Sequence, residues 1–202
     1  SQRTGKRVLH MDIGGGTSNL ALIEDGEIVR TGCMNVGGRL LKFDETGIVT
    51  YVSPVLEGIC SLKTGQKAEA EQVAAVAEIL AQALEMAAGL REKTELLERL
   101  WTRESGEPWE KSPENVTISF SGGVADCIGK ELPWDRFGDI GPVLGQVIAK
   151  SRLCQGEHRL GQQTIRATVI GAGCHSAQLS GSTVFYRNVS FPVKNRPVVA
   201  LA

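Results

Sequence analysis

The stretch His10-Met11-Asp12-Ile13-Gly14-Gly15-Gly16-Thr17-Ser18-Asn19 decides the fold of this chain. Apolar residues precede it and a second apolar run, residues 20–23, follows it, so the three glycines are predicted to join one strand to the next through a tight turn. Glycine adopts backbone conformations that are closed to residues with a Cβ, and its bare backbone lets N–H groups approach a charged oxygen. Successive amides that face inward form a concave anion site.

The residues beside the glycines suit the phosphate end of a nucleotide. Thr17 and Ser18 add hydroxyl donors, and Asp12 can hold a water of a Mg²⁺ ion that bridges phosphates. A glycine-rich turn without any ligand explains the glycines about equally well, but the Asp before them and the Thr after them favour phosphate. A P-loop and a dinucleotide-binding turn are both excluded, because each opens a helix, whereas Asp25-Gly26 between two apolar runs predicts a hairpin.

Composition narrows the class of protein. Of the 202 residues, 42% are hydrophobic and 22% charged, as in ordinary globular proteins. The net charge of -1 argues against nucleic acid or an anionic membrane as a partner held by bulk charge. No stretch predicts a membrane span or a signal peptide, so we expect a cytoplasmic protein. The five cysteines include no C-x-x-C pair, which favours reduced thiols over a zinc site or a disulfide framework.

Two further junctions repeat the pattern of a strand followed by glycines. Val116-Thr117-Ile118-Ser119-Phe120 predicts a buried strand that ends in Ser121-Gly122-Gly123 and a helix start, and a strand over residues 163–170 ends in Gly171-Ala172-Gly173 before a helix over 174–179. Helices are also predicted over residues 67–88, 91–101 and 141–151. Ligands of open α/β sheets bind at the carboxyl ends of strands, although a plain turn explains each junction in isolation. Gly37 and Gly38 are a further candidate contact, although paired glycines more often mark a turn or bulge.

The order of these motifs resembles the superfamily of actin-like ATPases and sugar kinases. Asp12-Ile13-Gly14-Gly15-Gly16-Thr17 resembles its second phosphate motif, and Ser121-Gly122-Gly123 resembles its adenosine motif. The resemblance implies an α/β fold, an actin-like ATPase (ribonuclease H-like) subdomain with a mixed sheet flanked by helices. It divides the chain into a strand-rich phosphate-binding part (7–66), a helical part with a connector (67–115), an adenosine-side α/β part (116–181) and a β-prone tail (182–202).

A more specific resemblance is to the ethanolamine ammonia-lyase reactivating factors. It is carried by residues 12–19, Asn35-Val36-Gly37-Gly38-Arg39-Leu40-Leu41, Asp139-Ile140-Gly141-Pro142, residues 166–173 and Leu179-Ser180-Gly181-Ser182-Thr183. It implies an ATP-dependent, cytoplasmic bacterial protein, associated in some bacteria with the ethanolamine-utilisation microcompartment. Its partner would be inactivated ethanolamine ammonia-lyase, from which damaged cobalamin would be released in exchange for intact adenosylcobalamin. The resemblance leaves a homo-oligomer open.

The resemblance implies ATP and Mg²⁺ as cofactors and a role for each matching residue. Asp12 would be the catalytic residue and would order a Mg²⁺-bound water. The phosphates would be held by Gly14, Gly15, Gly16, Thr17 and Ser18, the ribose would lie near Gly37 and Gly38, and the adenosine would border Gly122 and Gly123. Asn19 stands where many superfamily members have Asp, and the first phosphate motif of the superfamily does not occur in this sequence.

The missing motif, together with a start without Met and an end within an apolar run, predicts the second half of a longer protein. Half of a nucleotide cleft should bind ATP weakly, so we expect little or no ATPase activity from these 202 residues, and robust turnover in a phosphate-release assay would contradict this. Two alternatives remain at this stage. One is a small-molecule kinase of the same fold, with Asp126 as a candidate base, and the other is a noncatalytic scaffold that uses ATP as a switch.

Overall fold

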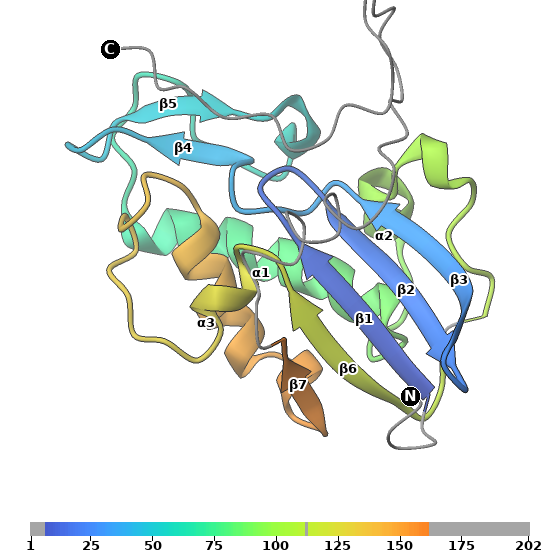
Figure 1. Cartoon of the computed structure of the whole chain (residues 1–202). Coiled ribbons are helices and arrows are strands. Elements are labelled where there is room, and N and C mark those ends of the chain that lie inside the picture. Colours follow the sequence, from blue (N-terminus) through green and yellow to red (C-terminus); the bar gives the residue numbers. More distant parts are fainter. Residues whose placement is uncertain (1–6, 112, 162–202) are drawn as a thin grey trace, which may run out of the picture.

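A computed structural model describes residues 7–111 and 113–161 of the chain, and Figure 1 shows their arrangement. In chain order the elements are β1 (Arg7–Ile13), β2 (Ser18–Glu24), β3 (Glu27–Met34), β4 (Leu41–Phe43), β5 (Val49–Val52), η1 (Pro54–Leu56), α1 (Ala70–Ala87), α2 (Glu95–Leu100), η2 (Arg103–Ser105), β6 (Val116–Ser121), η3 (Ala125–Cys127), α3 (Gly141–Lys150), η4 (Arg152–Cys154) and β7 (His158–Leu160).

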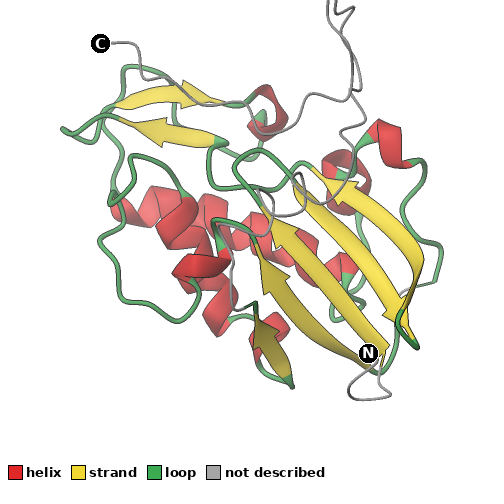
Figure 2. Cartoon of the chain, in the orientation of Figure 1, coloured by secondary structure: helices red, strands yellow, loops and turns green. Residues whose placement is uncertain are grey.

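Five of the strands form one sheet in the order β3-β2-β1-β6-β7, and β4 pairs with β5 in a separate two-stranded sheet (Figure 2). Strand β1 is antiparallel to β2 but parallel to β6, and β6 is parallel to β7. The sheet is therefore mixed and combined with helices, which confirms the predicted α/β class. Since β1 and β6 run in the same direction, the residues that follow them lie at the same edge of the sheet.

The hairpin between β2 and β3 turns at the two residues that predicted it. Asp25 has φ 48° and Gly26 has φ 91°. Positive φ at both central residues is the signature of a type I′ turn, whose twist matches that of the flanking strands. The Asp-Gly pair thus fixes where the chain reverses.

The side chains of strand β1 alternate between the two faces of the sheet. Leu9, Met11 and Ile13 are completely buried in the core, where residues of α1 and α3 join the same apolar cluster. Helix α1 passes behind the sheet in Figure 1, and α3 packs against α1. His10 and Asp12 alternate with the core residues and so point to the opposite face, because successive side chains of a strand alternate. No helix of the described part covers that face in Figure 1.

The helices begin and end near the predicted residues. Helix α1 spans Ala70–Ala87 rather than residues 67–88, because Glu69 and Gln72 form a capping box at its start and Gly89, with φ 76°, ends it. Helix α2 is shorter than the predicted 91–101, because the Thr94 side chain caps it by accepting a hydrogen bond from the Leu96 amide. Helix α3 begins at Gly141 with Pro142 in its first turn, as predicted.

One predicted helix is wrong and two strands were missed. The residues after Gly123 form only the 3-10 turn η3, because Ile128 returns to an extended conformation and Gly129 has φ 73°. Strands β4 and β7 have three residues each and show no sequence periodicity. The predicted strand over 163–170, the glycines at 171–173, the helix over 174–179 and the tail over 182–202 lie outside the described residues.

Among the described helices, none has the length and apolar character that crossing a membrane requires.

Candidate functional site

The glycine turn joins β1 to β2 as predicted. The Gly14 amide donates a hydrogen bond to the Thr17 carbonyl oxygen at 2.9 Å, which closes the turn. The expected backbone freedom is not used here, because none of Gly14, Gly15 and Gly16 has a positive φ. At Gly15 a side chain would be crowded, because a Cβ there would lie 3.1 Å from Cδ of Arg39. A Cβ on Gly16, in contrast, would meet nothing within 4 Å. The turn is therefore covered on one side and open on the other.

The segment around Gly37 and Gly38 covers the glycine turn. The Gly38 amide donates to the Gly14 carbonyl oxygen at 3.0 Å, and the Arg39 amide donates to that of Gly15 at 2.6 Å. A Cβ on Gly37 would lie 2.6 Å from the carbonyl carbon of Gly15, closer than real Cβ atoms approach. Gly37 thus permits direct contact between the two backbones. The structure brings these two predicted segments, which are about twenty residues apart, into one site.

Ser18 contributes to this site from inside the fold. Its side chain is completely buried, and its hydroxyl donates a hydrogen bond to the Val36 carbonyl oxygen at 2.7 Å. The hydroxyl therefore anchors the segment that leads into Gly37. The Thr17 hydroxyl has no hydrogen bond among the residues that the structure describes, so Thr17 is the better placed of the two to donate to a ligand.

The third glycine segment meets the end of β1. Gly122 has φ 89°, and a Cβ on it would lie 2.7 Å from the carbonyl carbon of Ile13 and 2.6 Å from Oδ1 of Asp12. The Val124 amide donates to the Ile13 carbonyl oxygen at 3.1 Å. A Cβ on Gly123 would meet nothing within 4 Å, so that glycine faces open space. Position 122 therefore needs a glycine, because its φ is positive and because a Cβ would collide with Ile13 and Asp12.

Asp12 lies at the centre of this arrangement. Its Oδ1 is buried and has no hydrogen-bond partner among the described residues. A buried carboxylate oxygen without a donor is unfavourable, because it has lost its hydration without compensation. A Mg²⁺-bound water would supply the missing donor, so the residues present fit the implied ion.

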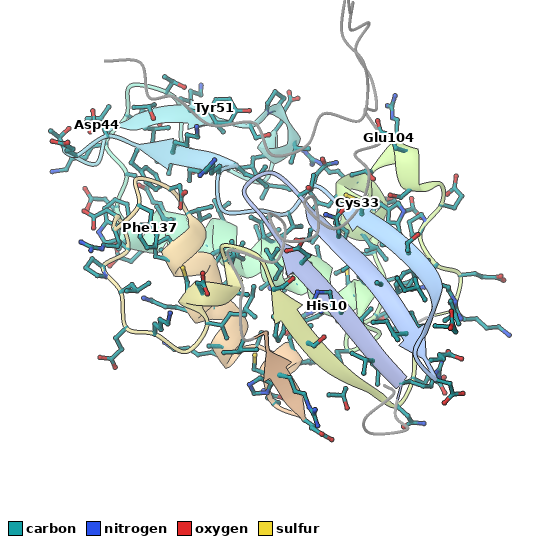
Figure 3. All side chains as sticks on the ribbon, viewed as in Figure 1. His10, Cys33, Asp44, Tyr51, Glu104 and Phe137 are labelled. Carbon is teal, nitrogen blue, oxygen red and sulfur yellow. The ribbon has the colours of Figure 1, made fainter. Side chains whose placement is uncertain are left out.

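His10 lies two residues before Asp12 on the same face of β1, where Figure 3 labels it. Its Nδ1 is 2.8 Å from Oγ of Ser119 and its Nε2 is 2.9 Å from Oγ of Ser121. Burial lowers the pKa of His10, and the negative charge of Asp12 opposes that shift. The imidazole thus connects β1 to β6 beside the candidate site.

A hollow of about 340 Å³ lies on this face of the sheet, and its lining includes His10, Asp12, Asn19 and Cys33. Cys33 is labelled on β3 in Figure 3, across the sheet from His10. Asn19 is exposed and pairs with Asp12 across β1 and β2. The hollow reaches Asp12 from the side opposite to the core, so the carboxylate is accessible from the uncovered face.

Further reactive side chains are those of Asp126, His158 and the described cysteines, of which Cys33 lines the hollow. Asp126 lies in η3 and is half-buried. His158 is exposed on β7, with its Nδ1 3.0 Å from the Gly156 carbonyl oxygen. The four described cysteines are free thiols, of which Cys127 is buried and the others are half-buried. In the described ranges, no group of three or more His, Cys, Asp and Glu side chains is arranged to hold a metal ion.

Sequence reasoning missed the contacts of His10 and the position of Arg39. The alternation of Ser119 and Ser121 showed that the two hydroxyls share one face, but only the parallel register, in which His10 is opposite Ser119 and Asp12 is opposite Ser121, brings them to the imidazole. Arg39 directly follows the glycine pair, and that position was the one available signal that its side chain would lie beside the turn.

Comparison with known proteins gives a consistent result. The family model described as "Ethanolamine utilisation protein EutA" matches residues 1–202. The chain is 38% identical over 208 residues to the ethanolamine ammonia-lyase reactivase EutA of Salmonella typhimurium strain LT2, which covers 95% of this chain and 42% of that protein. It is 37% identical over 198 residues to the protein of the same name from Escherichia coli strain K12, with the same two shares. The chain therefore spans less than half the length of these relatives.

Among solved structures, the chain is similar to the ethanolamine utilization protein EutJ from Carboxydothermus hydrogenoformans. The two share 19% sequence identity with a TM-score of 0.40, over 82% of this chain and 48% of that one.

Proposed function

Since the chain belongs to the family of the ethanolamine utilisation protein EutA, we propose that it forms the second lobe of an actin-like ATPase that reactivates ethanolamine ammonia-lyase. The names of the Salmonella typhimurium and Escherichia coli relatives, both ethanolamine ammonia-lyase reactivases, support the reactivase role. ATP dependence, the exchange of damaged for intact adenosylcobalamin, and a cytoplasmic or microcompartment-associated location are parts of this proposal.

The observation that carries the proposal is the close approach of the Gly37 and Gly122 segments to the end of β1 and the glycine turn that follows Asp12. Gly37 contacts the turn at Gly15, Gly122 contacts Oδ1 of Asp12, and that oxygen is buried without a partner in the described structure. Gly37 and Gly122 let the backbones approach closely, whereas Gly16 and Gly123 face open space in which a ligand could approach the backbone. The position of these segments after the carboxyl ends of β1 and β6 suits a phosphate chain with its metal ion.

Each residue of the pocket has a proposed role. Asp12 would hold a water of Mg²⁺, and the turn of Gly14, Gly15 and Gly16 with the Thr17 hydroxyl would hold the β- and γ-phosphates; the Gly14 amide closes this turn by donating to the Thr17 carbonyl oxygen. Ser18 acts indirectly, because its hydroxyl is bonded to Val36 inside the core.

The remaining glycines line the nucleoside. Gly37 and Gly38 would lie near the ribose, and Gly122 and Gly123 would border the adenosine. Hydrolysis of ATP to ADP and phosphate would supply the free energy, and Mg²⁺ would neutralise the phosphate charge.

Reactivation would follow from a nucleotide-dependent affinity for the lyase. A nucleotide shifts a conformational equilibrium only by its differential affinity for the two states. Hydrogen bonds join the β1–β2 turn, the Gly37 segment and the Gly122 turn, so a nucleotide that contacts all three segments would favour one relative arrangement of them. A client surface attached to these segments would then respond to the state of the nucleotide.

The direct test is capture of cyanocobalamin-inactivated ethanolamine ammonia-lyase by the full-length protein that contains this chain. We expect capture to depend on Mg-ATP and to be lost in Asp12→Asn, which keeps the shape of the side chain but removes its charge. Asp135→Asn is the matched control, because Asp135 is exposed and away from the glycine segments. Capture that is equal with and without nucleotide would contradict the proposed ATP dependence, and absence of capture would contradict the proposed partner.

A further inference from the structure

Arg39 lies against the glycine turn through both its backbone and its side chain. Its amide donates to the Gly15 carbonyl oxygen at 2.6 Å. A Cβ on Gly15 would lie 3.3 Å from Cγ, 3.1 Å from Cδ and 3.5 Å from Nε of Arg39. The aliphatic part of Arg39 therefore lies over the Cα of Gly15, and the absence of a side chain at Gly15 gives it that room.

The charge of Arg39 is available for a ligand. The residue is exposed, and its guanidinium makes no hydrogen bond or ion pair within residues 7–111 and 113–161. Its charge reaches Asp139, where burial raises the pKa of the carboxyl while Arg39 and Lys42 oppose that shift. Oδ1 of Asp139, however, accepts the Gly141 amide at 2.9 Å, at the start of α3. That carboxylate is thus engaged by backbone rather than by the guanidinium.

The other nearby cation is directed elsewhere. Nζ of Lys42 lies 5.9 Å from the ring centroid of Tyr51, on the β4–β5 sheet. Asp12 contributes a negative charge to the pocket, and a bound polyphosphate would add several more. Arg39 is the cation whose side chain contacts the glycine turn itself, so it is the group placed to offset that charge.

We propose that Arg39 binds the terminal phosphates of the nucleotide and makes the pocket selective for a triphosphate over a nucleoside. This assignment rests on the proposed nucleotide site and adds a side-chain cation to its backbone donors. A guanidinium forms two parallel N–H···O bonds with one phosphate group, which an ammonium group does not match. The contact of its stem with Gly15 limits the positions that the guanidinium can occupy.

The test compares two ligands and three variants in the full-length protein, by isothermal titration calorimetry. Arg39→Gln keeps the amide and the stem as far as Cδ but removes the charge, and Arg39→Lys keeps the charge without the planar group. Lys42→Gln is the matched control, because it removes a neighbouring exposed cation that is directed at Tyr51. The ligands are Mg-ATP and adenosine.

We expect Arg39→Gln to weaken Mg-ATP about 10-fold or more, as for loss of a hydrogen bond to a charged group. The affinity of Arg39→Gln for adenosine should stay within about 2-fold of the wild type. Arg39→Lys should recover part of the lost affinity for Mg-ATP, and Lys42→Gln should bind both ligands as the wild type does. An unchanged affinity of Arg39→Gln for Mg-ATP, or an equal loss for both ligands, would overturn the assignment of Arg39 alone. A wild-type protein that binds neither ligand would overturn the nucleotide site and this assignment together.

Discussion

The backbone of Gly37 lies directly against the backbone of Gly15: a Cβ on Gly37 would be 2.6 Å from the carbonyl carbon of Gly15 and 2.8 Å from the amide nitrogen of Gly16. Two segments that are separate in the sequence therefore form one wall of the candidate site. The atoms that a side chain would displace are backbone atoms, which cannot move aside by a rotamer change. The wall thus depends on the absence of a single Cβ.

Replacing Gly37 with Ala should destabilise the fold by about 1–3 kcal/mol, as expected for overpacking against a fixed backbone. Gly16→Ala is the control, because a Cβ there would meet nothing within 4 Å, and it should change stability by less than about 0.5 kcal/mol. Urea unfolding followed by circular dichroism measures both. Equal stability of the two variants would show that the two segments do not pack as described.

Gly122→Ala should destabilise the fold at least as much as Gly37→Ala, since the residue combines φ 89° with the contact to Asp12. The left-handed conformation alone accounts for roughly 1–2 kcal/mol in a residue with a Cβ. Gly123→Ala is the neighbouring control, with open space around its Cα. Thermal unfolding of the two variants should separate them by several degrees. A stable Gly122→Ala protein would contradict the close approach of this turn to β1.

Glu85 on α1 is expected to stabilise the junction of α1 with the end of α3. Its side chain is 5% exposed, its Oε2 accepts Nε of Arg91 at 2.8 Å, and its Oε1 accepts the Arg152 amide at 2.9 Å. Glu85→Gln removes the charge and turns one acceptor into a donor, so we expect a loss of about 1–3 kcal/mol in denaturant unfolding. Glu78→Gln, at an exposed position of the same helix, should cost less than about 0.5 kcal/mol. Similar losses in the two variants would argue against the buried ion pair.

Cys154 should react as a thiolate only at high pH. Burial raises its pKa from 9.0 to about 11. A thiol whose pKa is raised in the folded state retains its proton there after the unfolded chain has lost it. Its contribution to stability is therefore complete below pH 9 and is lost as the pH rises toward 11.

Alkylation of Cys154 as a function of pH, followed by peptide mass spectrometry, measures this shift. The same titration in denaturant is the control and should have its midpoint near 9, the ordinary value for a thiol. Identical midpoints in the folded and unfolded protein would contradict the described burial.

Local signals in the sequence predicted much of the sheet edge that carries the site. The Asp25-Gly26 turn, the glycine turn after Asp12 and the strand that ends at Ser121 depend on neighbouring residues, and the structure has each of them. Helix α1 followed from its apolar spacing. These elements were predictable because their conformations are set by neighbours in the sequence.

The remaining features depend on contacts between distant residues. Strand β4 exists because Leu41 and Lys42 pair with Val52 and Tyr51, and β7 exists because it joins the edge of β6. The burial of Ser18 against Val36, and the position of Arg39 over Gly15, likewise follow from how the Gly37 segment folds back. No local pattern reports such pairings.

The most direct measurement of the central claim is the binding of Mg-ATP to the full-length protein by calorimetry, beside its Asp12→Asn variant. We predict saturable heat for the wild type and an affinity about 10-fold or more lower for Asp12→Asn, as for loss of a group that orients a metal-bound water. A wild-type protein that gives no heat with Mg-ATP would contradict the claim that the three glycine segments and Asp12 form a nucleotide site.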